Sequence, residues 1–99
     1  MMSDHLIRHM TFRQLQIFEA SVRFGSFTRA AEALFLTQPS VSMQIKKLAD
    51  ALGLPLFEQV GRNLRPTEAG AELYKSCRQI FATLSNLEMK MADLKGVKA

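Results

Sequence analysis

The chain has 99 residues, 47% of them hydrophobic and 22% charged, which allows one small domain and argues against a disordered chain. Its formal net charge of +4 favours an acidic partner such as nucleic acid, and its single cysteine, Cys77, excludes an internal disulfide framework. The polar start carries no signal peptide and no apolar run reaches the roughly 20 residues that span a bilayer, so we expect a cytoplasmic protein with no membrane partner.

The first part of the chain predicts two helices with recognisable caps. Residues 1–10 show no periodicity and are expected to form a flexible leader. Thr11 can cap a helix that ends at Gly25, a residue able to adopt the left-handed conformation. The helical spacing of its apolar residues predicts a buried face of Phe12, Leu15, Phe18 and Val22. Ser26 can cap a second, short helix, whose apolar positions are Phe27, Ala30, Ala31 and Leu34.

A third helix is predicted from the cap Thr37 to about Leu52, with Pro39 in its first turn, where a missing N–H costs nothing. On a helical wheel its apolar residues form one stripe that we expect to be buried: Val41, Ile45, Leu48 and Leu52. The opposite face begins with small polar groups and becomes cationic; it carries Gln38, Pro39, Ser40, Ser42, Met43, Lys46 and Lys47.

This outward face suits a helix that enters the major groove of double-stranded DNA with its N-terminus leading. Gln38 can form a bidentate pair with adenine, the two serines can read donors or acceptors, and Met43 or Pro39 can contact a thymine methyl. Further candidate DNA contacts are Thr37 at the N-terminus, Lys46 and Lys47, and Arg29 from the preceding helix, the last three reaching phosphates. Taken alone, such a face is usually just solvated, but the two short helices and the tight turn before it favour DNA contact.

A hairpin is predicted between short strands near residues 57–59 and 64–66, because Val60-Gly61-Arg62-Asn63 is typical of a tight turn. Arg62 projects from the tip and Arg65 follows closely. A guanidinium on a narrow loop fits an A·T-rich minor groove, where the negative potential is deepest. Arg62 alone would be an ordinary exposed turn residue, but beside a reading helix a DNA contact is favoured.

Thr67 can cap a last helix over residues 67–95, in which apolar residues recur at heptad spacing. We call this set the heptad seam: Leu73, Cys77, Ile80, Leu84, Leu87, Met91 and Leu94. A helix of roughly 27 residues is about 40 Å long, more than the small domain can cover, so the seam predicts pairing with a second copy. Cys77 is then a small seam residue and not a nucleophile. In the alternative, the helix packs on its own core, as its first turns near Ala69 and Leu73 are expected to do.

These elements predict a mostly α fold. It consists of a winged helix-turn-helix of three helices and a two-stranded hairpin over residues 11–66, a dimerisation helix over 67–95, and a tail over 96–99. The predicted function is sequence-specific DNA binding as a homodimer, because two reading helices related by a two-fold axis would meet the half-sites of an inverted repeat.

Two other classes of function are weaker. A helical protein-interaction module would explain the heptads, but it leaves the Thr37 cap, the serine-rich face and the basic hairpin as coincidences. An enzyme is disfavoured because no carboxylate pair, phosphate loop or cysteine–histidine arrangement is visible. His5 and His9 could bind a metal only if the leader were helical, so we expect no metal and no cofactor.

From Phe12 to Gly70 the chain resembles the N-terminal domain of LysR-type transcriptional regulators. The resemblance is carried by Phe12-Arg13-Gln14-Leu15 with Phe18, Gly25-Ser26-Phe27-Thr28-Arg29-Ala30-Ala31-Glu32, Leu36-Thr37-Gln38-Pro39-Ser40-Val41-Ser42, Leu52-Gly53-Leu54-Pro55-Leu56-Phe57-Glu58 and Pro66-Thr67-Glu68-Ala69-Gly70. It implies a winged helix-turn-helix, a linker helix that mediates dimers, and an interrupted inverted repeat upstream of target genes. By position it assigns base reading to Gln38, Pro39, Ser40, Ser42 and Met43, and a minor-groove contact to Arg62.

The sequence departs from this family at three points. Met43 stands where more polar residues are common, and Gln59 stands where many members have arginine. Members also continue into a large effector-binding domain, whereas this chain stops about where the linker helix ends. We therefore expect DNA binding without a small-molecule effector site, and a tetramer only in a full-length parent. The residues after Leu36 and around Phe57 look most like the branch that controls Calvin-cycle carbon-fixation operons.

Overall fold

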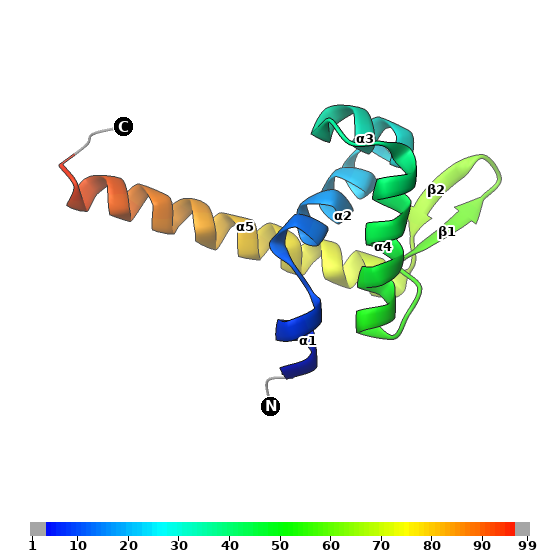
Figure 1. The fold of residues 1–99 in the computed structure, drawn as a ribbon, viewed down its shortest axis with the longest axis horizontal. Coiled ribbons are helices and arrows are strands. Elements are labelled where there is room, and N and C mark those ends of the chain that lie inside the picture. Colours follow the sequence, from blue (N-terminus) through cyan, green and yellow to red (C-terminus); the bar gives the residue numbers. More distant parts are fainter. Residues whose placement is uncertain (1–3, 97–99) are drawn as a thin grey trace.

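The computed structural model describes residues 4–96 of the chain. Five helices and one two-stranded antiparallel sheet follow in the order α1 (Asp4–His9), α2 (Phe12–Phe24), α3 (Phe27–Leu34), α4 (Gln38–Leu52), β1 (Phe57–Val60), β2 (Asn63–Pro66) and α5 (Glu68–Leu94) (Figure 1). The mostly α winged helix-turn-helix fold predicted from the sequence is confirmed. Within residues 4–96, no helix combines the length and the apolar character needed to cross a membrane.

The helix boundaries follow from local chemistry. Thr11, Ser26, Thr37 and Thr67 each accept, with a side-chain oxygen, the backbone N–H three residues ahead. Gly25 and Gly53 end α2 and α4 in the left-handed conformation, with φ of 63° and 78°. Each of these caps satisfies backbone groups that a helix end leaves unpaired.

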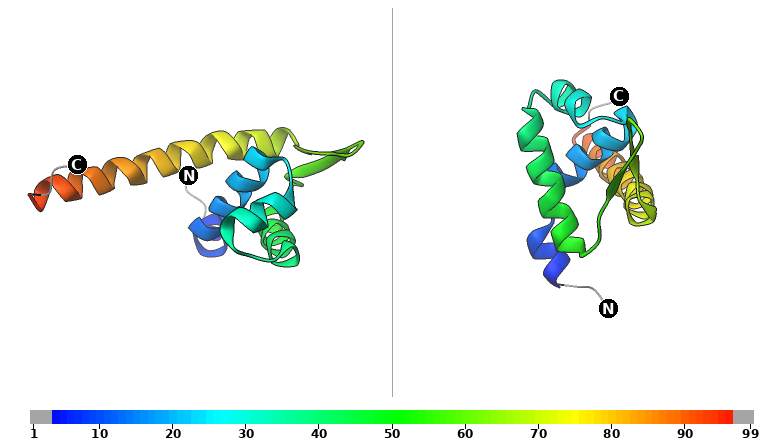
Figure 2. Two further views of the ribbon diagram at one scale, coloured as in Figure 1. Left: turned by 90° about the horizontal axis from the view of Figure 1, so that it is seen from above. Right: turned by 90° about the vertical axis from the view of Figure 1, so that its right-hand side faces the viewer.

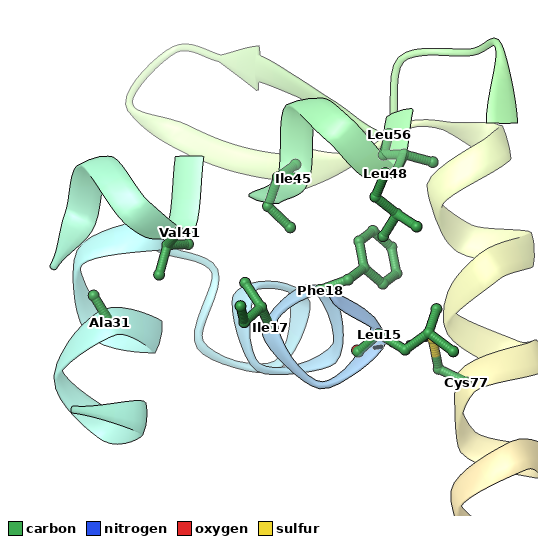
Figure 3. Packing of buried hydrophobic residues seen from close by; sticks show 9 residues of the cluster. All are labelled: Leu15, Ile17, Phe18, Ala31, Val41, Ile45, Leu48, Leu56 and Cys77. Carbon is green, nitrogen blue, oxygen red and sulfur yellow. Dashed lines mark hydrogen bonds between the residues drawn. The ribbon is translucent and has the colours of Figure 1, made fainter. Parts of the chain in front are cut away.

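The core lies where α2 packs against α3, α4 and α5, so that α2 occupies the space between α4 and the long helix α5 (Figures 1 and 2). Phe18, Leu15, Ile17, Val41 and Leu48 are all at most 1% exposed. Leu56, just before β1, and Cys77 of α5 add to this cluster from outside α2, α3 and α4 (Figure 3). The stripe predicted for α4 therefore faces the core, which fixes the direction of its opposite face.

Two sequence predictions about the start of the chain are wrong. Residues 4–9 of the predicted leader form α1, which packs against α4; the Met10 N–H donates to Leu6 O at 2.9 Å and the Met10 side chain packs on the core. Residues 1–3 lie outside the described part, as do residues 97–99 of the predicted tail. Phe12 is 62% exposed instead of buried, because it is the first residue of α2 and borders an open hollow that Leu34 and Phe81 also line.

The wing, by which we mean the β1–β2 hairpin over residues 57–66, is anchored to the start of α5. Thr67 donates its hydroxyl to Pro55 O at 2.7 Å and its N–H to Leu56 O at 3.0 Å. Gly70 lies so close that a Cβ at this position would overlap Leu56 O. Phe57 continues into the core, with ring centroids 5.3 Å from Phe18 and 5.2 Å from Phe27. These contacts fix the direction in which the wing leaves the helical body.

Candidate nucleic-acid interface

The reading helix α4 is held by its buried stripe and by one polar contact. Val41, Ile45 and Leu48 are at most 6% exposed, and Gln14 Nε2 of α2 donates to Gln44 Oε1 at 3.2 Å. Because about two turns of α4 are fixed in this way, the residues on its other side are presented outward in a single orientation. Most of the predicted DNA-contacting residues of α4 lie there, exposed or half-exposed: Thr37, Gln38, Pro39, Ser40, Ser42, Met43 and Lys46.

The N-terminal turn of α4 carries a small network of polar side chains. Thr37 Oγ1 accepts the Ser40 N–H at 3.3 Å and donates to Ser40 Oγ at 2.9 Å. Gln38 Nε2 donates to Ser42 Oγ at 2.7 Å. The contact with Ser42 uses one amide hydrogen and leaves the other, together with Oε1, available, since a glutamine amide has two N–H donors and one carbonyl oxygen. Thr37 therefore caps the helix in addition to lying on the outward face.

The turn before α4 holds a feature that sequence reasoning missed. Phe35, between α3 and α4, adopts φ 58°, and it is the one non-glycine residue with positive φ in the described part of the chain. Its side chain is 95% exposed, although phenylalanine is usually a core residue. Leu36 N donates to Ala31 O at 2.8 Å, which closes the turn. The left-handed residue makes the connection tight, and no residue type in the sequence marks this position, since glycine is the usual choice.

The structure separates the two lysines that were predicted to reach phosphates. Lys46 is exposed and pairs with Asp50 one turn later, with 3.4 Å between Nζ and Oδ2. Lys47 lines a hollow between α4 and α1, together with His5 and His9, and so lies toward the N-terminal helix. Arg29 is exposed on α3. Lys46, Lys47 and Arg29 are all exposed, so all three remain candidate phosphate contacts, and Lys47 in addition borders α1.

The wing presents the second group of cations. Gly61 at its tip has φ 63°, and the next residue, Arg62, is exposed and forms no ion pair with another described residue. Arg65 stands opposite Glu58 in the antiparallel register. Because the register places an acidic residue opposite Arg65, whereas Arg62 lies in the turn, Arg62 is the stronger candidate for an anionic partner.

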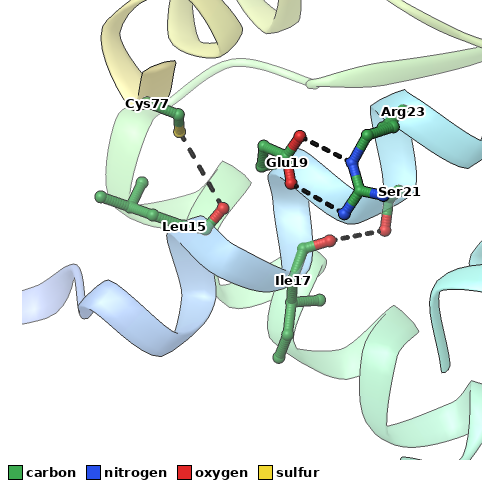
Figure 4. Close-up of polar contacts among 6 residues, drawn as sticks. All are labelled: Leu15, Ile17, Glu19, Ser21, Arg23 and Cys77. Atoms are coloured by element: carbon green, nitrogen blue, oxygen red, sulfur yellow. Dashed lines mark hydrogen bonds and ion pairs between the residues drawn. The ribbon is translucent and has the colours of Figure 1, made fainter. Parts of the chain in front are cut away.

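Arg23, one of the two arginines on α2, is paired within its own helix. Arg23 donates to both carboxylate oxygens of Glu19 at 3.0 and 3.2 Å (Figure 4), and this hydrogen-bonded pairing raises the pKa of the Arg23 guanidinium. In the same view Ser21 Oγ donates to Ile17 O at 2.8 Å within α2. Arg23 is thus part of a paired helix surface and adds little to the cationic character of the reading side.

The heptad seam divides into two parts. Cys77 is fully buried against Leu15 of the same chain, and its Sγ lies 4.0 Å from Leu15 O (Figure 4). Leu73 and Ile80 are partly buried and pack on the same core. The prediction that Cys77 faces a second copy is wrong, since this chain's own α2 covers it. The remaining seam residues, Leu84, Leu87, Met91 and Leu94, are 39–80% exposed.

The C-terminal part of α5 projects away from the other helices and from the hairpin of the described chain (Figure 2). Every residue from Ala82 to Leu94 is exposed except Ala92, which is half-exposed. A regular row of large apolar side chains in this position resembles an interface that lacks its partner.

Burial of the Cys77 side chain raises the pKa of its thiol to about 11, which argues against a role as a nucleophile.

Comparison with known proteins is consistent with this geometry. The model of the "Bacterial regulatory helix-turn-helix protein, lysR family" matches residues 12–71. Over 92 residues (93% of the chain, 30% of the relative) the chain is 47% identical to the HTH-type transcriptional activator CmpR of a Synechocystis strain. Over 89 residues (90% of the chain, 30% of the relative) it is 48% identical to the RuBisCO operon transcriptional regulator of Allochromatium vinosum. The chain thus spans about a third of the length of these curated relatives.

Solved structures give the same result. The BenM DNA-binding domain in complex with catB site 1 DNA superposes with a TM-score of 0.84 at 29% identity, over 91% of this chain and 100% of that one. A complex of the CbnR DNA-binding domain with DNA superposes with a TM-score of 0.80 at 29% identity, over 87% of this chain and 99% of that one. The chain therefore belongs to the LysR family of bacterial regulatory helix-turn-helix proteins.

Proposed function

We propose that this chain binds double-stranded DNA as a homodimer at an interrupted inverted repeat and thereby serves as the DNA-binding part of a bacterial transcriptional regulator. The observation that carries the proposal is the exposed polar N-terminal face of α4, held rigidly by a buried stripe behind it. A helix presented in this way fits the major groove, whose base edges its first turns can reach.

Individual roles follow from the chemistry of the exposed groups. Gln38 reads a base through its free N–H and Oε1, and Ser42 holds the amide in place while it does so. Met43, 49% exposed, and Pro39 offer apolar contacts to a thymine methyl. Lys46 and Arg29 contact phosphates, which positions the helix without specifying sequence. Arg62 enters the minor groove from the wing.

The exposed half of the heptad seam supplies the dimer. Leu84, Leu87, Met91 and Leu94 repeat at spacings of three, four and three, so they form one stripe that a second α5 can cover. Two chains joined along α5 present two reading helices related by a two-fold axis, and such a pair recognises the two halves of an inverted repeat.

The target genes are proposed to be carbon-fixation genes on the bacterial chromosome. The support is the identity of 48% with the RuBisCO operon transcriptional regulator of Allochromatium vinosum. The proposal also places the chain in the bacterial cytoplasm, where the chromosome lies.

The test is a fluorescence-anisotropy titration of the chain against an interrupted inverted repeat from a carbon-fixation promoter and against a scrambled duplex, at two salt concentrations. We expect binding to the repeat to be at least about tenfold tighter, with two chains per duplex, and to weaken with salt. Equal binding to both duplexes would leave only a charge effect. No binding at low salt would favour a protein-interaction module instead.

Paired variants separate base reading from charge. Gln38→Ala should cost about 1–3 kcal/mol on the repeat and little on the scrambled duplex. Lys46→Ala should weaken both duplexes alike and lower the salt slope by about 1. Lys75→Ala is the matched control, because Lys75 lies on α5 and pairs with Glu72 at 3.1 Å, away from the reading face. Equal losses from Gln38→Ala and Lys46→Ala would refute these roles.

A further inference from the structure

The N-terminal helix α1 places both histidines of the sequence side by side. His5 and His9 are four residues apart, and α1 spans Asp4–His9, so the two imidazoles project from one face of the helix. Their ring centroids are 4.6 Å apart. Helical structure is the condition under which this spacing can hold a metal ion, and the structure meets it.

The two histidines are exposed, and they border a shallow, open hollow. His5 and His9 line a hollow of about 320 Å³ between α1 and α4, together with Gln14, Lys47, Asp50 and Ala51. The carboxylate of Asp50 supplies negative charge, although Lys46 partly offsets it through their contact at 3.4 Å. Lys47 supplies an opposing positive charge. The site therefore has room for an ion with water ligands, and because the two lysines outweigh the one carboxylate, the imidazole nitrogens and not the surrounding charge must carry the affinity.

We propose that His5 and His9 form a two-imidazole chelating site for a divalent transition-metal ion, such as Zn²⁺ or Ni²⁺. Imidazole nitrogen is a preferred ligand of these ions. Within residues 4–96 no group of three or more histidine, cysteine, aspartate or glutamate side chains could hold a metal ion, so water completes the coordination. The site is accordingly exchangeable, and the fold does not depend on it.

The same geometry links the ion to the order of α1. A six-residue helix is far too short to be stable alone, so α1 depends on its packing against α4. An ion that joins His5 to His9 bridges one helical turn and favours the helical form. The site lies outside residues 12–71, which the family model matches, so the inference does not depend on the proposed DNA binding.

The test is isothermal titration calorimetry, in which the untagged, chelator-treated full chain is titrated with Ni²⁺ and with Zn²⁺. Two-dimensional NMR of the histidine ring nitrogens accompanies it. We expect one ion per chain and shifts confined to both imidazoles and the amides of α1 and the facing part of α4. His5→Gln or His9→Gln should weaken binding about tenfold or more, because the second ligand no longer acts at high effective concentration. The double variant should release no heat of metal binding at this site.

Two substitutions at one position test the helical geometry. Arg8→Pro keeps both imidazoles but breaks α1, because the ring removes the N–H and clashes with the carbonyl four residues earlier. Arg8→Ala removes the same charge and keeps the helix. Arg8→Pro should therefore bind about as weakly as the single-histidine variants, and Arg8→Ala at least as tightly as the parent. Asp50→Asn should weaken binding a few-fold.

Three outcomes would overturn the proposal. The first is the absence of 1:1 binding by the parent chain at millimolar metal. The second is unchanged binding in the double histidine variant, which would move the ion elsewhere on the chain. The third is equal binding by Arg8→Pro and Arg8→Ala, which would show that the helix contributes nothing.

Discussion

Gly70 is expected to control how the wing is attached to α5, and Gly70→Ala tests this directly. In a helix interior, glycine to alanine normally stabilises by roughly 0.5–1 kcal/mol, because alanine loses less backbone freedom on folding. At Gly70, however, the added Cβ would overlap Leu56 O and touch the Pro66 side chain at 3.0 Å. A backbone carbonyl cannot move aside cheaply, so we expect the overlap to outweigh the gain in helix propensity and Gly70→Ala to lower the free energy of unfolding.

The size of the effect follows from the same contact. Overpacking of this kind costs about 1–3 kcal/mol, and occasionally more. After the gain in helix propensity is subtracted, we expect a net loss of about 1–2 kcal/mol. For a chain of 99 residues this lowers Tm by about 4–16 °C. Relief of the overlap also requires Leu56 to shift, which disturbs the Thr67 hydrogen bonds to Pro55 O and Leu56 O.

The assay is thermal and urea unfolding followed by circular dichroism, with all variants at one protein concentration because a dimer's Tm depends on it. Ala71→Gly is the matched control: Ala71 is exposed on the same turn of α5, so it reports helix propensity alone and should lose about 1 kcal/mol. If Gly70→Ala instead gains about what Ala71→Gly loses, α5 does not approach Leu56 this closely in solution.

Three further predictions concern groups in other parts of the fold. Phe35→Asn should raise stability by about 0.5–1 kcal/mol in urea unfolding, because asparagine tolerates the left-handed φ of 58° and the phenylalanine side chain is almost fully exposed; a loss of stability would show that the ring makes a contact. The pKa of Cys77 is raised to about 11 from an ordinary 9.0, because burial favours the neutral thiol in the folded chain. The free energy of unfolding should therefore be at its full value below pH 9 and fall by roughly 2 kcal/mol between pH 9 and 11. Cys77→Ala should lack this fall, and an aromatic disulfide reagent should label the native thiol only after unfolding. Leu87→Glu should raise the dissociation constant of the dimer about tenfold or more in sedimentation equilibrium. Met89→Glu should leave it unchanged, because Met89 has similar exposure but lies on the opposite side of α5. Equal effects of the two variants would exclude the exposed seam as the interface.

The features that could be predicted from the sequence are those set within a few residues. The caps Thr11, Ser26, Thr37 and Thr67 all act as predicted, because an N-cap needs only a side-chain oxygen and the N–H three residues ahead. The buried stripe of α4 was predictable because the helical period places Val41, Ile45 and Leu48 on one face. From that stripe the outward direction of Gln38 and Ser42 follows.

The features that were missed depend on contacts far along the chain. Nothing within residues 4–9 stabilises a helix strongly, and α1 exists because α4 lies beside it. Lys47 was grouped with Lys46 from the helical wheel, but the presence of α1 places it in a separate hollow. Phe35 lies in the tight turn that the sequence predicts before α4, but its left-handed conformation accompanies the close packing of α3 on α4, which no local residue pattern marks.

The heptad seam shows what a periodic pattern can and cannot specify. Seven apolar positions from Leu73 to Leu94 define one face of α5 without saying what covers that face. Up to Ile80 the cover is the core of the same chain, and from Leu84 onward no residue of the described chain provides it. A change at Cys77 should therefore act first on folding, and a change at Leu87 first on association. Because one helix carries both halves, the contacts of residues 73–80 with the core set where α4 would lie relative to the two-fold axis of the proposed dimer.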